Sequence, residues 1–441
     1  MKRLMTVFLV LLLVVSLMAC STTPGVTNGT DKEPSGSSDG ELKGTIRFST
    51  WGSLDEKKVN EDIIAAFEED NPGCKVELEF IPEQYVAKID TMFVGGNAPD
   101  VIYGHPHYFA NWASKGLLMD LDERFKEDED FFYNDEVFST EVYDGFKWNG
   151  KHIATINGHD TYLLFYNKDM FDAAEVDYPT DDWTWNDLVE AGKKLTVLEG
   201  DNKQYGITLS NNPQDLFPYI YSHGGSIFDD MNNPTKVTFD NPDTVAGLQF
   251  MQDLMYKHKI APTTQDNQAL GGSFDTGRVA MDITGMWAVV SRKNITDFNW
   301  DVANLPIREG YPRKTGVLYA GYAISKNTKN PELAWEFAKY FQSDKGQELL
   351  SSLGLITVIN KQIASSDAVL GGPGMPEHHA LRVSSIDYAQ QSYGFLTNLD
   401  EIHTKVMSPL FDQLLANTKD PVAVAKEMQE GLEKMLNEAK K

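Results

Sequence analysis

The sequence alternates short β-prone runs with helical segments, and this alternation limits the folds open to the chain. Residues 45–50 (TIRFST) predict a strand, and apolar residues at every fourth position over 59–67 predict a helix. That helix is expected to end at the Asn-Pro-Gly of 71–73. Alternating apolar residues over 76–80 and the run 101–103 predict two further strands. These spacings indicate a βαβ unit, a mainly parallel sheet and therefore an α/β fold.

Several later helices carry recognisable start signals. Thr184 and Asp187 have the spacing of a capping box. Asn241, Asn330 and Asp420 each precede a proline, which predicts a capping side chain followed by proline at the first helical position. The apolar faces of these helices predict core packing and no cofactor site.

Length, charge and cysteine content narrow the protein class. A chain of 441 residues favours two domains. The formal charge of −26 excludes a basic surface for nucleic acid or anionic membranes and indicates a solvated acidic surface. Of the two cysteines, we assign Cys20 to processing, so Cys74 is expected to be unpaired and to be a small buried or half-buried residue.

The first 42 residues predict export and anchoring. Lys2 and Arg3 precede the apolar run 4–18, which is too short to span a bilayer and is typical of a signal peptide over 1–19. The sequence LMAC ending at Cys20 resembles a lipobox, which implies that the thiol is acylated and becomes the mature N-terminus. Residues 20–42 are then the lipidated cysteine and a flexible tether. A plain signal peptide and an uncleaved anchor are the alternatives.

No catalytic or metal-binding motif stands out. The glycine-rich run 371–374 lacks the lysine of a phosphate-binding loop, and no nucleophile elbow is present. The histidines at 105, 107, 378 and 379 lack the spacing of a zinc protease. The acidic run 120–130 lacks EF-hand spacing and predicts an exposed helix. We therefore predict no catalytic residue, no metal and no cofactor.

Aromatic residues recur beside small or polar residues outside the helical apolar faces. They are Trp51, Tyr85, Tyr108, Trp287 and Tyr322. The C–H face of a sugar ring packs against such flat side chains, and ligands of open α/β sheets bind beyond the carboxyl ends of strands. Each one alone is equally well explained as an ordinary core or rim residue. Their joint recurrence at predicted strand ends favours ligand binding.

Seven segments, in order, resemble the family-1 extracellular solute-binding proteins of ABC importers, the class that includes maltose-binding protein. The resemblance extends over about 44–440. The segments are TIRFSTWG, AAFEEDNPGCKVELEF, GGNAPDVIYG, LLFYNKDMF, WTWNDLVEAGKKLT, GRVAMDITGMW and AGYAISKNTKNPELAWEFAKYFQSDKGQ.

The resemblance implies a two-lobe, periplasmic-binding-protein-like α/β fold with a ligand cleft between lobes joined by hinge crossings. One lobe would comprise 43–158 plus 303–350 and the other 159–302 plus 351–441. A sugar, expected to be an oligosaccharide, would close the cleft and be delivered to permease subunits by a membrane-anchored monomer. Together with the aromatic pattern, the resemblance gives these predicted ligand-binding residues: Trp51, Ser53, Gln84, Tyr85, His107, Tyr108, Asp160, Trp287, Gly321, Tyr322 and Tyr393, with Phe395 in the same C-terminal region.

Two alternatives stay open at this point. One is a lipoprotein receptor for a non-sugar solute such as a polyamine, a phosphodiester or a metal, since Asp160 and the aromatics would also suit a cation. The other is a secreted glycoside hydrolase with two cleft carboxylates. His107 and Tyr108 differ in type from the family's polar pair, which argues against naming maltose as the ligand. Asp100 is expected to bond backbone near a strand end.

Overall fold

The structure is a computed structural model, and it describes most of the chain beyond the predicted tether. The predicted signal peptide, tether and lipidated Cys20, together with Tyr393 and Phe395, lie outside the described residues. The described residues are 42–134, 137, 140–200, 203–210, 212–231, 234–270, 274–392 and 396–439.

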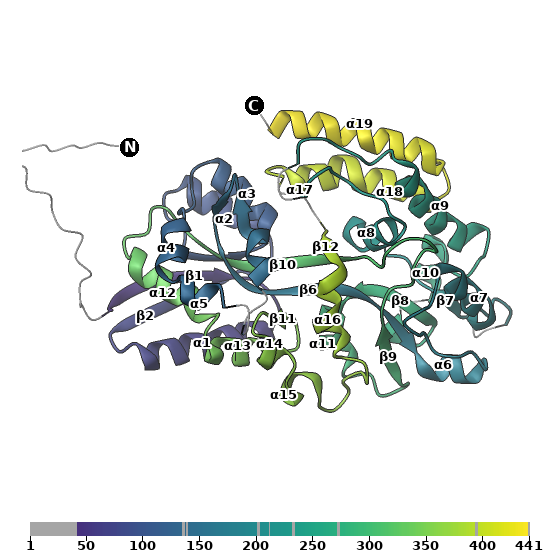
Figure 1. Ribbon diagram of the computed structural model, residues 1–441, viewed down its shortest axis with the longest axis horizontal. Helices are drawn as coiled ribbons and strands as arrows, with labels where there is room; N and C mark the ends of the chain where they lie inside the picture. Colours follow the sequence, from purple (N-terminus) through teal and green to yellow (C-terminus); the bar gives the residue numbers. More distant parts are fainter. Residues whose placement is uncertain are drawn as a thin grey trace, which may run out of the picture. The chain divides into compact units, whose positions relative to one another are not determined.

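The described residues form one ten-stranded mixed sheet and a separate two-stranded sheet (Figure 1). The main path runs β2-β1-β3-β10-β6-β8-β7, with β9 and β11 also paired to β6 and β12 to β10. The strands are β1 (Gly44–Thr50), β2 (Cys74–Phe80), β3 (Val101–Gly104), β4 (Lys147–Trp148), β5 (Lys151–His152), β6 (Thr155–Asn167), β7 (Tyr205–Ile207), β8 (Val279–Gly285), β9 (Trp300–Ala303), β10 (Thr315–Ile324), β11 (Thr357–Val358) and β12 (Ala389–Gln391).

Helices surround this sheet and fall into two groups, which β6 and β10 connect by running from one to the other (Figure 1). The α-helices are α1 (Leu54–Asp70), α2 (Tyr85–Val94), α3 (Pro106–Ser114), α4 (Asp122–Glu127), α5 (Glu129–Phe132), α6 (Lys168–Ala173), α7 (Trp185–Leu195), α8 (Pro213–Ser222), α9 (Pro242–Tyr256), α10 (Thr264–Leu270), α11 (Val289–Arg292), α12 (Pro331–Tyr340), α13 (Asp344–Ser351), α14 (Lys361–Ala364), α15 (Asp367–Leu370), α16 (Leu381–Ser384), α17 (Leu399–Ile402), α18 (Ser408–Leu415) and α19 (Pro421–Ala439). The 3-10 and π segments are η1 (Thr140–Phe146), η2 (Phe274–Thr276), η3 (Met286–Ala288), η4 (Ser385–Tyr388) and η5 (His403–Met407).

The predicted βαβ unit is confirmed, but the prediction of a mainly parallel sheet is wrong. β1 pairs in parallel with β2 and with β3. β10, however, is antiparallel to β3 and to β6, and β6 is antiparallel to β8, β9 and β11. The cause is that two long strands cross between the helix groups in opposite directions. Each crossing strand therefore runs against most of its neighbours.

Three of the four predicted helix caps are confirmed. Thr184 and Asp187 form the predicted capping box, and the side chain of Asn241 accepts the N–H of Thr244. Asp420 accepts the N–H of Ala423 at 3.0 Å. Asn330 precedes its helix as expected, but it makes no side-chain cap.

The Asn330 amide is used for a long-range contact. It donates to the carbonyl of Thr45 at 2.9 Å and so joins the start of α12 to β1. Asp100 bonds backbone as predicted, because its carboxylate accepts the N–H of Arg47 at 2.8 Å. Both side chains therefore bond the backbone of β1, which lies between β2 and β3.

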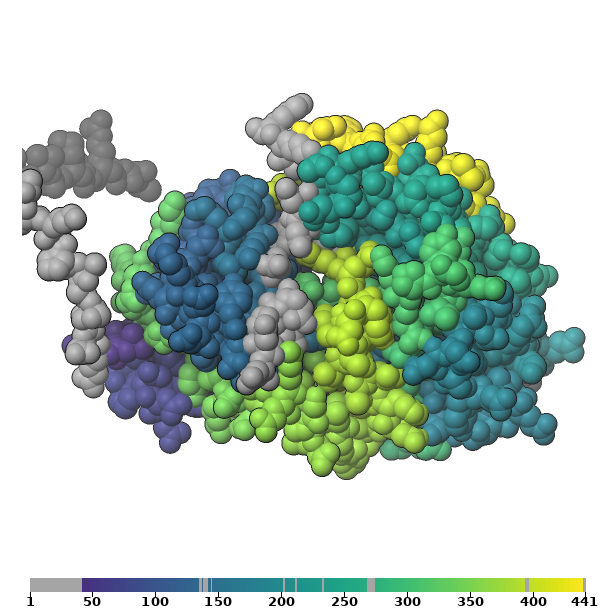
Figure 2. Space-filling view, viewed as in Figure 1, coloured from purple at the N-terminus to yellow at the C-terminus, as the bar shows by residue number. Residues whose placement is uncertain are grey.

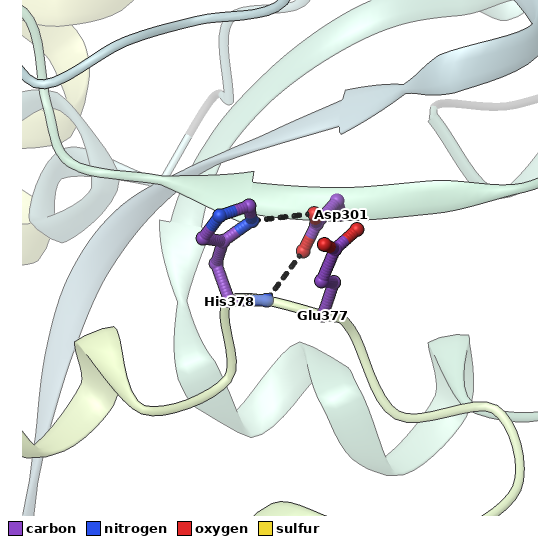
Figure 3. Close-up of side chains that lie close together, drawn as sticks. All are labelled: Asp301, Glu377 and His378. Atoms are coloured by element: carbon purple, nitrogen blue, oxygen red, sulfur yellow. Dashed lines mark hydrogen bonds and ion pairs between the residues drawn. The ribbon is translucent and has the colours of Figure 1, made fainter.

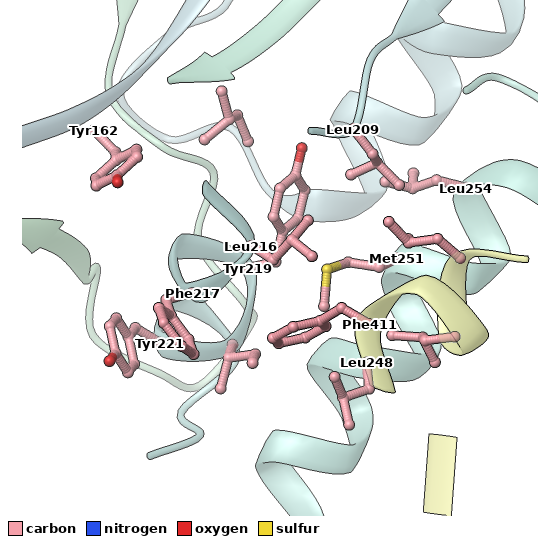
Figure 4. Packing of buried hydrophobic residues seen from close by; sticks show 14 of the residues in the cluster. Tyr162, Leu209, Leu216, Phe217, Tyr219, Tyr221, Leu248, Met251, Leu254 and Phe411 are labelled. Atoms are coloured by element: carbon pink, nitrogen blue, oxygen red, sulfur yellow. The ribbon is translucent and has the colours of Figure 1, made fainter. Parts of the chain in front are cut away.

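The apolar core divides into two large clusters and a smaller one. The first cluster draws on residues 46–156 and 320–364, and the second on residues 162–305 and 396–436. In the second, Phe217 of α8, Met251 of α9 and Phe411 of α18 pack together (Figure 4). The small cluster lies around Phe165 and Trp300. The two crossing strands contribute side chains to both large clusters, which makes them the structural link between the two halves.

Cys74 matches the sequence prediction. Its side chain is buried and unpaired, and its thiol donates to the carbonyl of Leu42 at 3.2 Å. Burial raises the pKa of this thiol, so the residue behaves as a small apolar side chain. Among the residues that the structure describes, no helix has the combined length and hydropathy to cross a bilayer.

Candidate functional site

A cavity of about 200 Å³ lies between the two large clusters. Trp51 packs against the first cluster and Trp287 against the second, and both line the cavity. The crossing strands β6 and β10 supply part of its wall. The lining residues are Trp51, Glu56, Tyr103, His105, His159, Asp160, Gln214, Trp287, Leu318, Tyr319, Ala320, Leu355 and Ile356.

Trp51 follows β1, where the strand ends and the chain turns into α1. Its half-buried indole lies against three aromatic rings, with centroid separations of 4.7 Å to Tyr85, 4.5 Å to Tyr103 and 5.4 Å to His105. These contacts hold the indole in one orientation before any ligand arrives. A preformed aromatic platform of this kind loses little conformational entropy on binding.

Trp287 reaches the same cavity from the 3-10 segment η3, which follows β8 directly. Its ring meets Tyr162 edge-on at a centroid distance of 5.2 Å. A Cβ atom added to Gly285 would lie 1.8 Å from Cζ3 of the indole. The glycine at 285 therefore provides the space that the indole occupies.

Two carboxylates line the cavity. Glu56, in the first turn of α1, accepts the backbone N–H of Ser53 at 2.6 Å and completes a capping box with that serine. Asp160 on β6 is only 4% exposed, and neither carboxylate oxygen has a well-formed hydrogen bond within the described residues. Burial raises the Asp160 pKa to about 7, although the charge of Arg382 and the nearby N–H of Trp287 favour the ionised form.

Two histidines in the lining are held neutral. His159 is 2% exposed, neither ring nitrogen has a hydrogen-bond partner within the described part of the chain, and burial lowers its pKa to about 3. Nδ1 of His105 lies 2.8 Å from the carbonyl oxygen of Tyr319, so Nδ1 carries the proton. Burial lowers the pKa of His105 as well. Asp160 and the neutral His159 thus present hydrogen-bond acceptors and one donor at the cavity lining.

His107 and Tyr108 occupy the first turn of α3. His107 lines a smaller hollow of about 70 Å³ that shares His105, Gln214 and Tyr319 with the cavity. The Tyr108 ring lies 6.2 Å from Trp51 but does not line the cavity. Burial, with a contribution from the negative charge of Asp400, raises the pKa of Tyr108 to about 12.

Two predicted aromatic residues lie behind the lining. Tyr85 is 7% exposed, and its hydroxyl lies within hydrogen-bonding distance of the Ser49 hydroxyl and the carbonyl of Tyr103. Tyr322 is 1% exposed and stacks on Phe341 at 3.8 Å. Tyr322 reaches only a narrow hollow of about 30 Å³ behind Trp51. The structure thus places both rings in the support of the site.

Three further predicted residues have clear backbone roles. Ser53 caps α1, and Gln84 is an exposed N-cap of α2 with a φ of 54°. A Cβ on Gly321 would lie 2.1 Å from the carbonyl oxygen of Thr155, so glycine permits close strand approach there. Of the predicted set, the structure brings Trp51, Asp160 and Trp287 together in the cavity.

Sequence reasoning missed several lining residues. Glu56 was visible as the second half of a Ser-x-x-Glu capping box, and His159 as the direct neighbour of the predicted Asp160 on the same strand. Gln214 follows the Asn-Pro start of α8 and had no signal beyond helix capping. His105 follows a predicted strand end, where a polar ligand contact or loop packing was expected, and it does line the cavity. The remaining missed residues are Tyr103, Leu318, Tyr319, Ala320, Leu355 and Ile356.

Asp301, Glu377 and His378 form a separate cluster with the donor types of a metal site (Figure 3). The fully buried Asp301 accepts the backbone N–H of His378 at 3.0 Å, the Nδ1–H of its ring at 2.7 Å and the hydroxyl of Tyr166 at 3.2 Å. Glu377 pairs with Lys168 at 3.3 Å. Because these carboxylate oxygens already have hydrogen-bond or ion-pair partners, we assign the cluster no metal. Its contacts tie the loop at 377–378 to β9.

Comparison with known proteins decides the family. A family model described as bacterial extracellular solute-binding protein matches residues 51–348. The chain belongs to this family. The galactooligosaccharide-binding protein of Bacillus subtilis (strain 168) is 25% identical over 317 residues, which are 68% of this solute-binding protein and 69% of the relative.

Solved structures agree on the fold. The substrate-binding protein Lmo0181 of Listeria monocytogenes, in complex with cycloalternan, has a TM-score of 0.77 and 26% identity, covering 90% of this chain and 99% of the other. UgpB of Mycobacterium tuberculosis, in complex with glycerophosphocholine, has a TM-score of 0.73 and 18% identity, covering 90% and 100%. This solute-binding protein therefore has the two-lobe α/β fold that its sequence predicted.

Proposed function

We propose that this solute-binding protein captures an oligosaccharide between its two lobes and delivers it to an ABC importer. The observation that carries the proposal is that Trp51 and Trp287, attached to different core clusters, line one cavity with Glu56 and Asp160. Indole faces suit the C–H surface of a sugar, and carboxylates accept hydrogen bonds from its hydroxyls. A ligand that contacts both indoles would favour the closed arrangement of the lobes.

The relatives support a saccharide as the ligand class. The Bacillus relative carries the name of a galactooligosaccharide-binding protein, and the Listeria structure contains cycloalternan. The adjoining hollow beside His107 supports a ligand longer than one ring, because it continues from the main cavity past Gln214 and Tyr319.

A cationic solute such as a polyamine is the second candidate. Two carboxylates beside two indoles also suit an ammonium group. A glycoside hydrolase has weaker support, because the Glu56 carboxylate is already engaged by the backbone N–H of Ser53. We accordingly propose a binding protein without catalysis.

The test is a thermal-shift screen of the purified protein, followed by calorimetry on positives. The panel contains galacto-, malto- and arabino-oligosaccharides, their monosaccharides and spermidine. A raised melting temperature with an oligosaccharide, and recovery of the intact sugar by chromatography, support the proposal. A shift with spermidine alone, or cleaved sugar, contradicts it.

The lobe boundaries are proposed as 43–158 plus 303–350 and 159–302 plus 351–441. Core packing supports the division in outline. Ala303 and Leu305 pack in the second large cluster with Leu318 against it, whereas the first large cluster resumes at Ala320 and extends to Ala364. We therefore propose that the two later crossings lie beyond the limits drawn from the sequence, between 305 and 320 and after 364.

We also propose export with removal of residues 1–19, lipid anchoring through Cys20 and an extracytoplasmic location as a monomer. The family description as extracellular supports the location. A tether over 20–42 would keep the lobes close to the importer's permease subunits while leaving them free to reorient.

A further inference from the structure

A buried guanidinium lies behind His159 and Asp160 of β6, which form the floor of the cavity. Arg382 of α16 is 0% exposed; its Nε donates to the Thr357 hydroxyl at 2.9 Å, and its Nη1 donates to the carbonyl of Gly354 at 3.1 Å and to Nε2 of His379 at 3.0 Å. Nη2 has no hydrogen-bond partner within the described residues. On the face shown in Figure 2, the yellow-green residues of α16 and β12 lie between the blue and teal halves of the molecule.

Arg382 is connected to the floor through the sheet. Thr357, which accepts its Nε–H, pairs with His159 in the antiparallel ladder of β11 and β6. Asp160 is the next residue of β6, and both floor residues line the cavity. The guanidinium therefore lies one strand away from a buried carboxylate and a buried imidazole, neither of which has a well-formed hydrogen bond.

We infer that Arg382 is a specificity-determining positioning residue, whose buried positive charge balances Asp160 so that the cavity accepts an uncharged polyhydroxylated ligand and rejects a cationic one. The inference rests on the proposed function, because it explains which of the two candidate ligand classes the same cavity selects.

The charge balance follows from the groups that face the floor. A buried carboxylate without a counter-charge takes up a proton or attracts a cation. Here the guanidinium supplies the counter-charge from inside the protein, and it acts electrostatically on both Asp160 and His159. His159, His105 and His379 are neutral, since burial lowers the pKa of each.

Glu56 is the remaining charged group of the lining. It belongs to a helix start, and its carboxylate already accepts the Ser53 N–H. An ammonium group on the floor would have to approach Arg382, whereas a hydroxyl group can donate to Asp160 without that repulsion. The arrangement therefore disfavours a cation and leaves hydrogen-bonding capacity for a neutral ligand.

The first experiment measures the titration of the Asp160 carboxyl in the protein without any ligand. The Asp160 carboxyl is followed by carbon-13 NMR over the pH range, with Asp160→Asn to identify its signal. Arg382→Met is expected to raise the titration midpoint by about one pKa unit or more, and Arg382→Lys to restore most of the wild-type value. Arg278→Met, which removes an arginine that donates to the Lys203 carbonyl and not to the β11–β6 ladder, should leave the midpoint unchanged.

The second experiment measures selectivity by calorimetry near pH 9, with choline as a cation whose charge does not titrate. Wild type should bind the screened oligosaccharide and not choline. Arg382→Met should gain choline affinity by about tenfold or more and lose saccharide affinity by a similar factor. Arg382→Gln repeats both measurements if the methionine variant fails to fold.

The role of Arg382 is overturned if Arg382→Met and Arg382→Gln both keep the wild-type titration midpoint of Asp160 and the wild-type affinity for choline. Tight choline binding by wild type overturns it as well. The titration and the choline measurements need no saccharide. Absence of sugar binding in wild type alone would thus refute the proposed function and leave the role of Arg382 to be judged by these two results.

Discussion

Replacing Gly285 by alanine tests the role of Trp287 without touching the indole itself. The new Cβ would lie 1.8 Å from Cζ3, whereas ordinary contacts begin at 3.4 Å, so the ring must move by at least about 1.6 Å. The backbone at Gly285 has φ −74° and ψ 157°, which alanine adopts without strain. The perturbation therefore falls on the position of the indole.

The expected loss of binding free energy is that of one aromatic contact with the ligand. Displacing the Trp287 indole should weaken binding by about 1–3 kcal/mol, or roughly 5- to 150-fold in Kd. Calorimetry with the best oligosaccharide from the screen measures the loss in Gly285→Ala, in Trp287→Ala and in the double variant. If the glycine acts through the indole, the double variant should be no weaker than Trp287→Ala alone.

Two results would refute this reasoning. Wild-type affinity in Gly285→Ala, with a correctly folded protein by circular dichroism, would mean that the indole has room to move without leaving its contact. Fully additive losses in the double variant would mean that Gly285 affects binding by a route other than Trp287.

Four further predictions concern stability and anchoring. Ser53→Ala should lower the free energy of unfolding in urea by about 1 kcal/mol through loss of the α1 cap, and Ser53→Asn should keep most of it. Asp160→Asn should stabilise the ligand-free protein more at about pH 8 than at about pH 4. The reason is that the buried carboxyl holds its proton up to a pKa of about 7, against an ordinary 3.8, so wild-type stability falls as pH rises between those values; a pH-independent difference would contradict this. Asp301→Ala should lower the free energy of unfolding by about 3 kcal/mol, because it leaves buried donors unpaired. A chelator should leave the melting temperature of the wild-type protein unchanged. Cys20→Ala should release the protein from the membrane fraction with ligand binding intact, and continued membrane attachment would argue against lipidation.

The sequence predicted local structure well where a short-range signal sufficed. The separate strands and helix of the βαβ unit and the capping box at Thr184 each follow from residues within a few positions of each other. The sheet direction did not follow, since the antiparallel strands β6 and β10 meet only through long-range pairing. Asn330 shows the same limit, because its amide bonds Thr45 far along the chain instead of capping its own helix.

The functional site likewise contains residues that the sequence predicted correctly and residues that it did not. Trp51 and Trp287 were predictable because aromatic residues at strand ends face a ligand edge. Tyr85 and Tyr322 carried the same local signal, yet they pack behind the lining against Ser49 and Phe341. Local sequence does not distinguish an aromatic platform from the ring that supports it, since the difference depends on which side of the sheet edge each ring occupies.

The crossing strands suggest why the site lies where the lobes join. β6 is buried over its whole length, and the cavity takes His159 and Asp160 from it and Leu318, Tyr319 and Ala320 from β10. The pairing of these strands is interrupted between Ala320 and Gly321. Such an irregularity redirects side chains and weakens the ladder locally. In the proposed function, a ligand that binds His159 and Asp160 therefore contacts the two strands that connect the lobes, and closure would act through these same strands.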